Sequence, residues 1–461
     1  MRRISLLILL GLLCWPAAAA ASPRQVVTFE APRELLSAST RGATLDQIRS
    51  FGVDHVRQLV YWRDYAPRAN SRRKPRGFDA SDPAAYPAGK WANLDGLVAA
   101  ARERGISVML TLTGPAPRWA TRAKRDHYTR PSAKEFGAFA TAIGRRYGDA
   151  VSTWSIWNEP NQPQFLKPQY KHGKPYSPKL YRQLYRAAYK GLRSTPANAH
   201  DTILIGETSP RGNRHVVHPL AFLRGMLCLN GKWHKTRKCA ALPADGYAHH
   251  AYTTSAGPRF RPRDKDDVTI GVLSRLVRGL DRAARAHALP KRLPIYLTEF
   301  GIQSRPDRIS GVSYQRQAAY RAVAEHIAYV NPRVVAFSQY LMSDDPPRRK
   351  GYRYSGFESG LRRSNGRAKP AYEGFRLPLA VEVYGHSDVL WGLVRPQRSV
   401  SRVTIERRTK RGKKWHPLKT LDTTATGVYA LRTRHRDGQR YRVRWTSPEG
   451  RTYTGPPVRG Y

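Results

Sequence analysis

Several carboxylates in this chain directly follow short apolar segments, at the points where strands would end. They are Glu30, Glu159, Glu207, Glu299 and the pair Asp344 and Asp345. A carboxyl group in a cleft can donate a proton, accept one, or attack an electrophilic carbon. Two of them can share one reaction only if the fold brings them together. The elements that carry them therefore decide which acids can meet.

Strand-like and helix-like segments alternate along most of the chain. Eight apolar strand-like segments lie at 26–30, 53–62, 106–112, 151–157, 202–206, 246–252, 293–300 and 334–341. Most of the intervals contain apolar residues at i, i+3 and i+4, the pattern of an amphipathic helix. Eight such units predict a parallel (β/α)8 TIM barrel, in which chemistry sits at the carboxyl ends of the strands. The alternative is an open doubly wound sheet, which usually has a glycine-rich turn after its first strand, and none is present here.

The pattern changes near residue 381. The segments VEVYG, VTIERRT, GVYALRTR and QRYRVRWTS alternate apolar and polar residues and are separated by turn-forming residues. This period of two predicts a small antiparallel β-sandwich at 381–461, after a barrel domain at 22–380.

Two short motifs carry a family resemblance. WNEP at 157–160 follows the fourth predicted strand, and TEFG at 298–301 ends the seventh. Together they resemble the pattern of clan A glycoside hydrolases, which are retaining enzymes on a (β/α)8 barrel, and the resemblance covers residues 26–380. It implies hydrolysis of O-glycosidic bonds, with Glu159 as acid/base, Glu299 as nucleophile and no cofactor. Retaining hydrolysis needs two carboxyl groups about 5–5.5 Å apart, one protonated and one ionised at rest.

The same resemblance implies roles for four neighbours of this pair. Asn158 would hydrogen-bond the sugar 2-hydroxyl, and Arg57 would lie beneath the nucleophile. The segment HHAY places His250 in the cleft wall and Tyr252 in a hydrogen bond to the nucleophile. A purely structural imidazole is the alternative for His250.

Further sugar contacts are expected from side chains at the strand ends, for which simple packing is the alternative. They are Trp62, Trp119, Trp157 and Gln339. Many clan members carry a tryptophan at the end of the eighth strand, where this chain has Gln339 and Tyr340. This departure leaves the family within the clan and the sugar undefined.

The N-terminus and the cysteines point to export. Two arginines, an apolar stretch and an alanine run precede Ser22, which predicts a signal peptide over 1–21 and a secreted protein. An uncleaved anchor is the alternative, and no other segment reaches the roughly 18 apolar residues of a membrane helix. Cys228 and Cys239 then favour one disulfide, which we expect to hold an insertion at 207–245 that shapes the cleft. Two thiolates without clustered histidines give too few ligands for a metal site.

The chain carries a net charge of +48, spread along its whole length. This indicates either an acidic or cell-wall-derived poly- or oligosaccharide partner or a compositional bias towards arginine. No nucleic-acid-binding motif accompanies the charge, and we expect a monomer. The competing function is a catalytically inactive carbohydrate- or cell-wall-binding protein. The presence of both Glu159 and Glu299 favours an enzyme.

Overall fold

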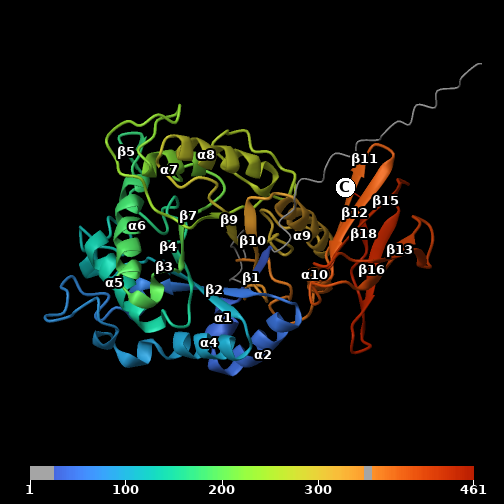
Figure 1. Ribbon diagram of the computed structural model, residues 1–461, viewed down its shortest axis with the longest axis horizontal. Coiled ribbons are helices and arrows are strands. Elements are labelled where there is room, and N and C mark those ends of the chain that lie inside the picture. The colour runs from blue at the N-terminus through green and yellow to red at the C-terminus, as the bar shows by residue number, and fades with distance from the viewer. Residues whose placement is uncertain (1–24, 347–355, 461) are drawn as a thin grey trace, which may run out of the picture.

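The computed structural model describes residues 25–346 and 356–460, so the predicted signal peptide lies outside the described residues. These residues fold into a barrel followed by a β domain (Figure 1). Across the described ranges, no helix combines the length and the apolar character that a membrane crossing would require.

Eight parallel strands close into the barrel. They are β1 (Val26–Glu30), β2 (His55–Tyr61), β3 (Ser107–Thr113), β4 (Thr153–Ile156), β7 (Thr202–Thr208), β8 (Gly246–His250), β9 (Ile295–Glu299) and β10 (Val334–Tyr340). The first strand pairs in parallel with both β2 and β10, which closes the sheet. Each strand overlaps one of the eight predicted segments, and the predicted TIM barrel is confirmed.

Helices cover the outside of the barrel. They are α1 (Pro32–Leu36), α2 (Ala38–Ser50), α3 (Trp62–Tyr65), α4 (Ala92–Glu103), α5 (Ala133–Tyr147), α6 (Ser177–Arg193), α7 (Pro219–Met226), α8 (Leu273–Arg285), α9 (Tyr314–Tyr329) and α10 (Pro370–Arg376). Strand β2 shows how the two faces divide, because successive side chains of a strand point to opposite faces. Val56 and Val60 pack in the core beneath the helices, which turns Arg57 and Tyr61 towards the barrel interior.

The β domain consists of two antiparallel sheets. One contains β11 (Leu379–Tyr384), β12 (Ser387–Leu393) and β15 (Val428–Arg434); the other contains β13 (Arg402–Arg408), β14 (His416–Asp422), β16 (Arg440–Thr446), β17 (Thr452–Thr454) and β18 (Val458–Arg459). Val381 and Leu390 of the first sheet share a core with Ile405 and Val443 of the second. The predicted β-sandwich is confirmed, and its first strand begins at Leu379, close to the predicted domain division.

The sandwich is fixed against the barrel through α9, as Figure 1 shows. Trp391 and Leu393 of β12 pack on Val323 of that helix. Behind them the guanidinium of Arg395, which is fully buried, donates to both carboxylate oxygens of Glu325 at 2.6 and 2.7 Å. The first sheet is therefore covered on both faces.

Candidate active site

The end of β4 is shaped to turn a carboxylate over the barrel mouth. The backbone N–H of Trp157 donates to the Leu112 carbonyl at 2.8 Å, and the N–H of Asn158 donates to the Thr113 hydroxyl at 3.0 Å. Trp157 and Glu159 then adopt left-handed backbone conformations, with φ of 65° and 39°. Such conformations are costly for residues other than glycine and cluster at functional sites. They end the strand and direct Glu159 into the mouth.

Two strand irregularities place further carboxylates at the same mouth. The register of β7 against β8 shifts between Gly206 and Thr208, so Glu207 is turned out of the regular pairing. Gly206 is required there, because a side chain at its φ of 115° would collide with the carbonyl oxygen of Ala248. The register of β8 against β9 also shifts before Glu299, which lies opposite His250. Bulges of this kind re-aim side chains and are common near active sites.

The imidazole of His250 links three of these carboxylates. Its Nδ1 atom lies 2.9 Å from Oε1 of Glu159 and 3.6 Å from Oε2 of Glu299. Its Nε2 atom lies 2.5 Å from Oε2 of Glu207. Burial alone would lower the pKa of His250, but the charge of Glu299 and the hydrogen bonds to Glu159 and Glu207 raise it to about 10. The ring is therefore a cation at neutral pH.

Arg57 lies beneath the same group and is fully buried. Its guanidinium donates to Oε2 of Glu207 at 2.9 Å, to Oδ1 of Asn158 at 2.8 Å and to Oε2 of Glu299 at 3.2 Å. It also donates to Glu30 at the end of β1. A buried guanidinium remains charged only with such partners, and here its partners form the floor of the site.

The carboxylates of this group differ in their proton affinities. Burial raises the pKa of Glu159, an effect that the neighbouring His250 only partly opposes. Burial raises the pKa of Glu30 to about 8, and its Oε2 atom has no hydrogen-bond partner among the described residues. Burial would also raise the pKa of Glu207, but the charge of Arg57 and the hydrogen bond from His250 lower it to about 2. The site thus holds protonated and ionised carboxyl groups side by side.

A cleft of about 260 Å³ opens above this group. Both Glu159 and Glu299 line it, together with Gln162, Tyr252 and Asp307. The Tyr252 hydroxyl donates to Oε1 of Glu299 at 2.7 Å. The geometry therefore offers two adjacent carboxylates, one of them with a raised pKa, in a polar cleft at the carboxyl ends of the strands.

A family model described as cellulase (glycosyl hydrolase family 5) matches residues 21–335. The chain belongs to this family. It is therefore a glycosidase that hydrolyses O-glycosyl compounds. Among curated proteins, none matches this chain.

Solved structures share the fold of this family 5 hydrolase at low sequence identity. A family 39 glycoside hydrolase from Bacteroides cellulosilyticus WH2 is 16% identical, with a TM-score of 0.55 over 89% of this chain and 81% of that one. A subfamily 18 family 5 enzyme from Streptomyces cattleya, solved with GlcNAc, is 16% identical, with a TM-score of 0.52 over 76% and 79%. A monomeric β-xylosidase from Caulobacter crescentus CB15 is 15% identical, with a TM-score of 0.51 over 95% and 98%.

The structure brings six of the predicted site residues of the hydrolase together. They are Glu159, Glu299, Asn158, Arg57, His250 and Tyr252. Two further acids, Glu30 and Glu207, for which the sequence predicts only a position at a strand end, belong to the same network. Their positions at the ends of β1 and β7 were a usable signal. No sequence motif distinguishes Glu30 and Glu207 from acids that cap helices or form surface ion pairs.

Three other predicted sugar contacts lie outside the cleft lining. Trp62 is fully buried and its ring stacks on Phe139. Trp119 is 6% exposed and its indole N–H donates to the Pro67 carbonyl at 3.1 Å. Gln339 is 1% exposed and accepts a hydrogen bond from Arg321 at 2.8 Å. These side chains support the barrel wall from behind and have almost no surface to offer a sugar.

Trp157 has a similar position. It is fully buried, and its indole N–H donates to the Phe165 carbonyl at 3.3 Å. Its ring lies against Gly114, where an added Cβ would come within 2.6 Å of it. The packing of Trp157 fixes the backbone that precedes Glu159.

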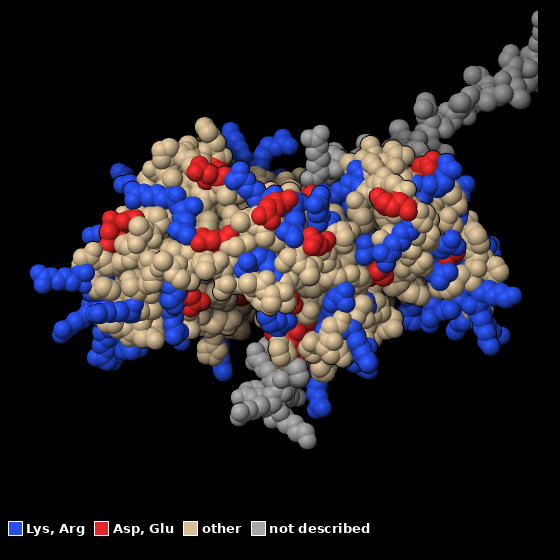
Figure 2. Space-filling model, turned by 90° about the horizontal axis from the view of Figure 1, so that it is seen from below, with Lys and Arg blue, Asp and Glu red and all other residues tan. Residues whose placement is uncertain are grey.

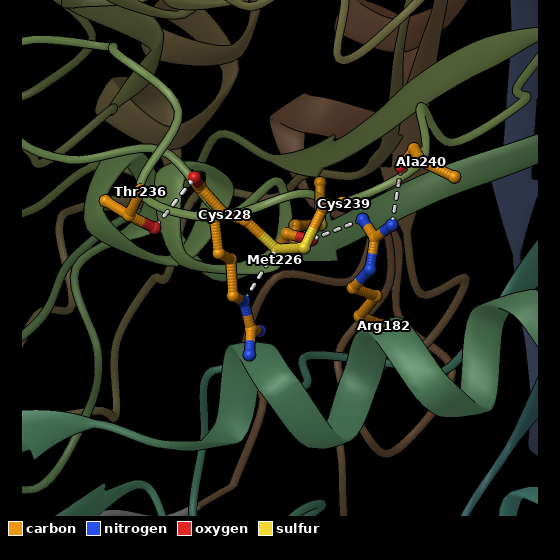
Figure 3. Close-up of a disulfide and its surroundings, with 7 residues drawn as sticks. Arg182, Met226, Cys228, Thr236, Cys239 and Ala240 are labelled. Carbon is orange, nitrogen blue, oxygen red and sulfur yellow. Dashed lines mark hydrogen bonds between the residues drawn. A yellow bond between two sulfur atoms is a disulfide. The ribbon is translucent and has the colours of Figure 1, made fainter.

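The predicted disulfide between Cys228 and Cys239 is confirmed. It closes a loop that follows α7, and Arg182 of α6 donates to the carbonyls of Met226 and Ala240 on either side of it (Figure 3). This loop connects a helix to the next strand, so it lies at the opposite end of the barrel from the active site. Ser209 and Pro210, at the start of the segment 207–245, line the cleft, whereas none of the residues 211–245 does, so the cleft is bordered by the beginning of this segment and not by its disulfide-held loop.

One group among the described residues has the composition of a metal site. His218, Asp264 and Asp267 bring their ligand atoms within 4.8 Å of one another. Both ring nitrogens of His218 already face these carboxylates, at 2.7 Å and 3.6 Å. None of the three lines the cleft of the hydrolase.

Proposed function

We propose that this hydrolase is an exported enzyme that cleaves a poly- or oligosaccharide by double displacement, with retention of configuration. The observation that supports this most directly is the position of the two cleft carboxylates. Glu159 and Glu299 both lie within 3.6 Å of one nitrogen atom, Nδ1 of His250. Such closeness favours retaining chemistry, for which carboxyl groups stand about 5–5.5 Å apart, over inverting chemistry at about 6.5–9.5 Å.

In the first step, the Glu299 carboxylate attacks the anomeric carbon while Glu159 gives its proton to the leaving glycosidic oxygen. The carbon–oxygen bond of the glycoside breaks, and an ester bond to Glu299 forms. The raised pKa of Glu159 suits it to deliver this proton. Tyr252 and Arg57 each donate to one oxygen of Glu299, which fixes the direction of attack.

In the second step, Glu159 takes a proton from water, and the water oxygen attacks the anomeric carbon. The ester bond to Glu299 breaks, and the sugar leaves with its original configuration. Asn158 lies beside the acid/base and is oriented by Arg57 at 2.8 Å, which supports a contact between its amide and the sugar 2-hydroxyl.

Export and a monomeric state belong to the same proposal. The sequence pattern over 1–21 and a disulfide of the kind that persists in oxidising compartments both favour export. N-terminal sequencing of the secreted protein should find cleavage near Ala21 or Ser22. A secreted protein that retains Met1 would contradict it. A single species of monomer mass in sedimentation would support the monomeric state.

The catalytic proposal is tested by incubating the secreted protein with a panel of polysaccharides and following the anomeric protons of the product by NMR. The first product should have the configuration of the substrate, and Glu299→Ala should abolish turnover. Glu103→Gln, which removes an exposed carboxylate from α4, is the control and should leave turnover unchanged. Inverted product, or turnover that survives Glu299→Ala, would overturn the mechanism.

A further inference from the structure

A second cavity lies beside the cleft. Its volume is about 910 Å³, and four cationic side chains line it: Arg122, Arg130, Lys167 and Arg214. The polar part of its wall is completed by Thr129, Gln169, Tyr170 and His215, and no acidic residue is among the described residues that line it. We call this cavity the basic pocket.

The loop that follows β4 forms the wall between the basic pocket and the cleft. Gln162 and Gln164 of this loop line the cleft, whereas Pro163 and Lys167 line the basic pocket. Pro163 is four residues from Glu159, so their α-carbons are at most about 15 Å apart. A glycan that leaves the cleft across this loop would reach the pocket.

The walls of the basic pocket are held together by backbone contacts. The N–H of Arg130 donates to the Lys167 carbonyl at 2.9 Å, and the N–H of Lys167 donates to the Tyr128 carbonyl at 3.0 Å. Tyr170 donates to the carbonyls of Asn213 and Val216 at 3.2 Å, which joins the loop after β4 to the loop after β7. These contacts fix the backbone of the pocket walls relative to one another.

The cations of the pocket form no ion pair within the part of the chain that the structure describes. None of the ion pairs found there involves Arg122, Arg130, Lys167 or Arg214. Arg130 and Lys167 instead lie over the rings of Tyr176 and Tyr128, at 5.3 Å and 5.5 Å. The charge of Lys167 helps to lower the pKa of the nearby Asp126, but the carboxylate of Asp126 accepts hydrogen bonds from Thr129. Four cations around one cavity repel one another, and an anion would relieve that repulsion.

Positive charge alone does not mark a site on this protein. Figure 2 shows Lys and Arg side chains over both the barrel and the β domain. A comparable cavity of about 770 Å³, lined by Lys232, Arg282 and Arg285, lies near the carboxyl end of α8, away from the active site. The basic pocket differs because it shares a wall with the cleft.

We propose that the basic pocket binds an anionic group, a carboxylate or a sulfate ester, on the same glycan whose neighbouring sugar occupies the cleft. The inference rests on the proposed glycosidase function and narrows its substrate to acidic poly- or oligosaccharides. Arginine and lysine are the side chains that recognise such groups, and arginine can bind them with two parallel hydrogen bonds.

The test compares two triple variants of the full secreted protein. Arg122→Gln/Lys167→Gln/Arg214→Gln removes three exposed cations from the basic pocket, and Lys232→Gln/Arg282→Gln/Arg285→Gln removes three exposed cations from the remote cavity. The two variants have equal net charge. Calorimetry then measures binding of an oligogalacturonate, its methyl-esterified form, an O-sulfated oligosaccharide and a single-stranded DNA of similar length.

We expect the unaltered protein to bind at least one acidic oligosaccharide about tenfold more tightly than the neutral ester. The pocket variant should lose this preference, and the remote variant should keep it. The acidic ligand that shows the preference distinguishes carboxylate from sulfate recognition. The proposal is overturned by equal loss in both variants, by the absence of any preference, or by DNA binding that depends equally on the pocket.

Kinetics separate this inference from the proposed function. On an acidic substrate that the enzyme hydrolyses, the pocket variant should show a KM raised about tenfold with kcat unchanged, and turnover of a neutral substrate should be unaltered. If no substrate is turned over, the binding comparison still decides the role of the pocket. An unchanged KM on the acidic substrate would overturn it.

Discussion

The Nε2 atom of His250 lies 2.5 Å from the Oε2 atom of Glu207, beneath the floor of the cleft. Both side chains are fully buried. Glu207 thus holds the imidazole so that its other nitrogen faces Glu159 and Glu299. Glu207 contacts no sugar in the proposed reaction. It orients His250, whose side chain lies between Glu159 and Glu299, the two carboxylates that act on the sugar.

Glu207→Gln should lower the pKa of His250, because it removes one of the charges that raise this pKa to about 10. It should also lower the free energy of unfolding by about 3 kcal/mol, since it leaves a buried guanidinium and imidazolium with less negative charge. NMR titration of His250 and urea unfolding would measure these effects. Thr298→Val, which removes only the hydroxyl that donates to Glu207 at 3.1 Å, should change both less. An unaltered His250 titration would contradict the orienting role.

Stability should fall as the pH rises above neutrality. Native Glu30 keeps its proton to about pH 8, whereas an ordinary glutamate loses it near pH 4.5. Native His250 keeps its proton to about pH 10 rather than about 6.5. Between about pH 4.5 and 8 for Glu30, and between about pH 6.5 and 10 for His250, the native state binds more protons than the unfolded chain. Within its range, each group therefore lowers the free energy of unfolding by about 1.4 kcal/mol for each unit that the pH rises.

Urea unfolding across pH 5–10 measures this slope, and Glu30→Gln should flatten it between pH 5 and 8. Glu207 acts in the opposite direction at acid pH. Its stabilisation is present above about pH 4.5 and is lost as the pH falls towards 2. Stability that rises steadily from pH 5 to 9 would contradict the proton states assigned to Glu30 and His250.

Glu159→Ala should slow cleavage of natural glycosides by about 10²–10⁴-fold, the usual contribution of a general acid. Aryl glycosides with an acidic phenol as leaving group should lose much less in the first step, because that leaving group departs without a proton. Comparing pre-steady-state rates for two aryl leaving groups measures the difference. An equal loss for both would assign the proton donor to another residue.

Replacing both cysteines should affect stability and leave catalysis intact. Cys228→Ser/Cys239→Ser opens a short loop and should lower the free energy of unfolding by about 2–3 kcal/mol. At a temperature where the variant is folded, kcat and KM should match the parent, because the disulfide lies at the far end of the barrel. A changed KM would place this loop near the substrate after all.

The barrel and the central pair of acids were predictable because their signals are local. Alternating apolar segments defined the eight strands, and WNEP and TEFG marked Glu159 and Glu299. Trp62 and Gln339 were harder to place, because a strand end carries side chains for both the mouth and the wall. Trp62 begins α3 and turns into the core, and Gln339 turns towards Arg321 of α9. Whether such a side chain faces the mouth or the core depends on the path of the backbone at the end of the strand.

The convergence of Glu30 and Glu207 on Arg57 could not be read from the sequence for a related reason. Glu207 is turned inward by the register shift beside Gly206, and a bulge leaves no pattern in a stretch as short as TILIGET. The bond from Arg57 to Glu30 joins the paired strands β2 and β1, whereas the bond from Arg57 to Glu207 joins β2 to β7, which is not its neighbour in the sheet. Both contacts depend on how the strands assemble rather than on any one segment.

The buried ion pair between Arg395 and Glu325 joins the sandwich to the barrel. Arg321 also binds Glu325, at 2.8 Å, and reaches Gln339 of β10, so one chain of contacts runs from the β domain into a barrel strand. Separating the two parts would remove Arg395 from the buried Glu325, leave Arg321 as its remaining cationic partner, and expose the face of β12 that covers α9. Barrel and sandwich should therefore melt as one calorimetric unit, and a barrel produced alone should be prone to aggregate.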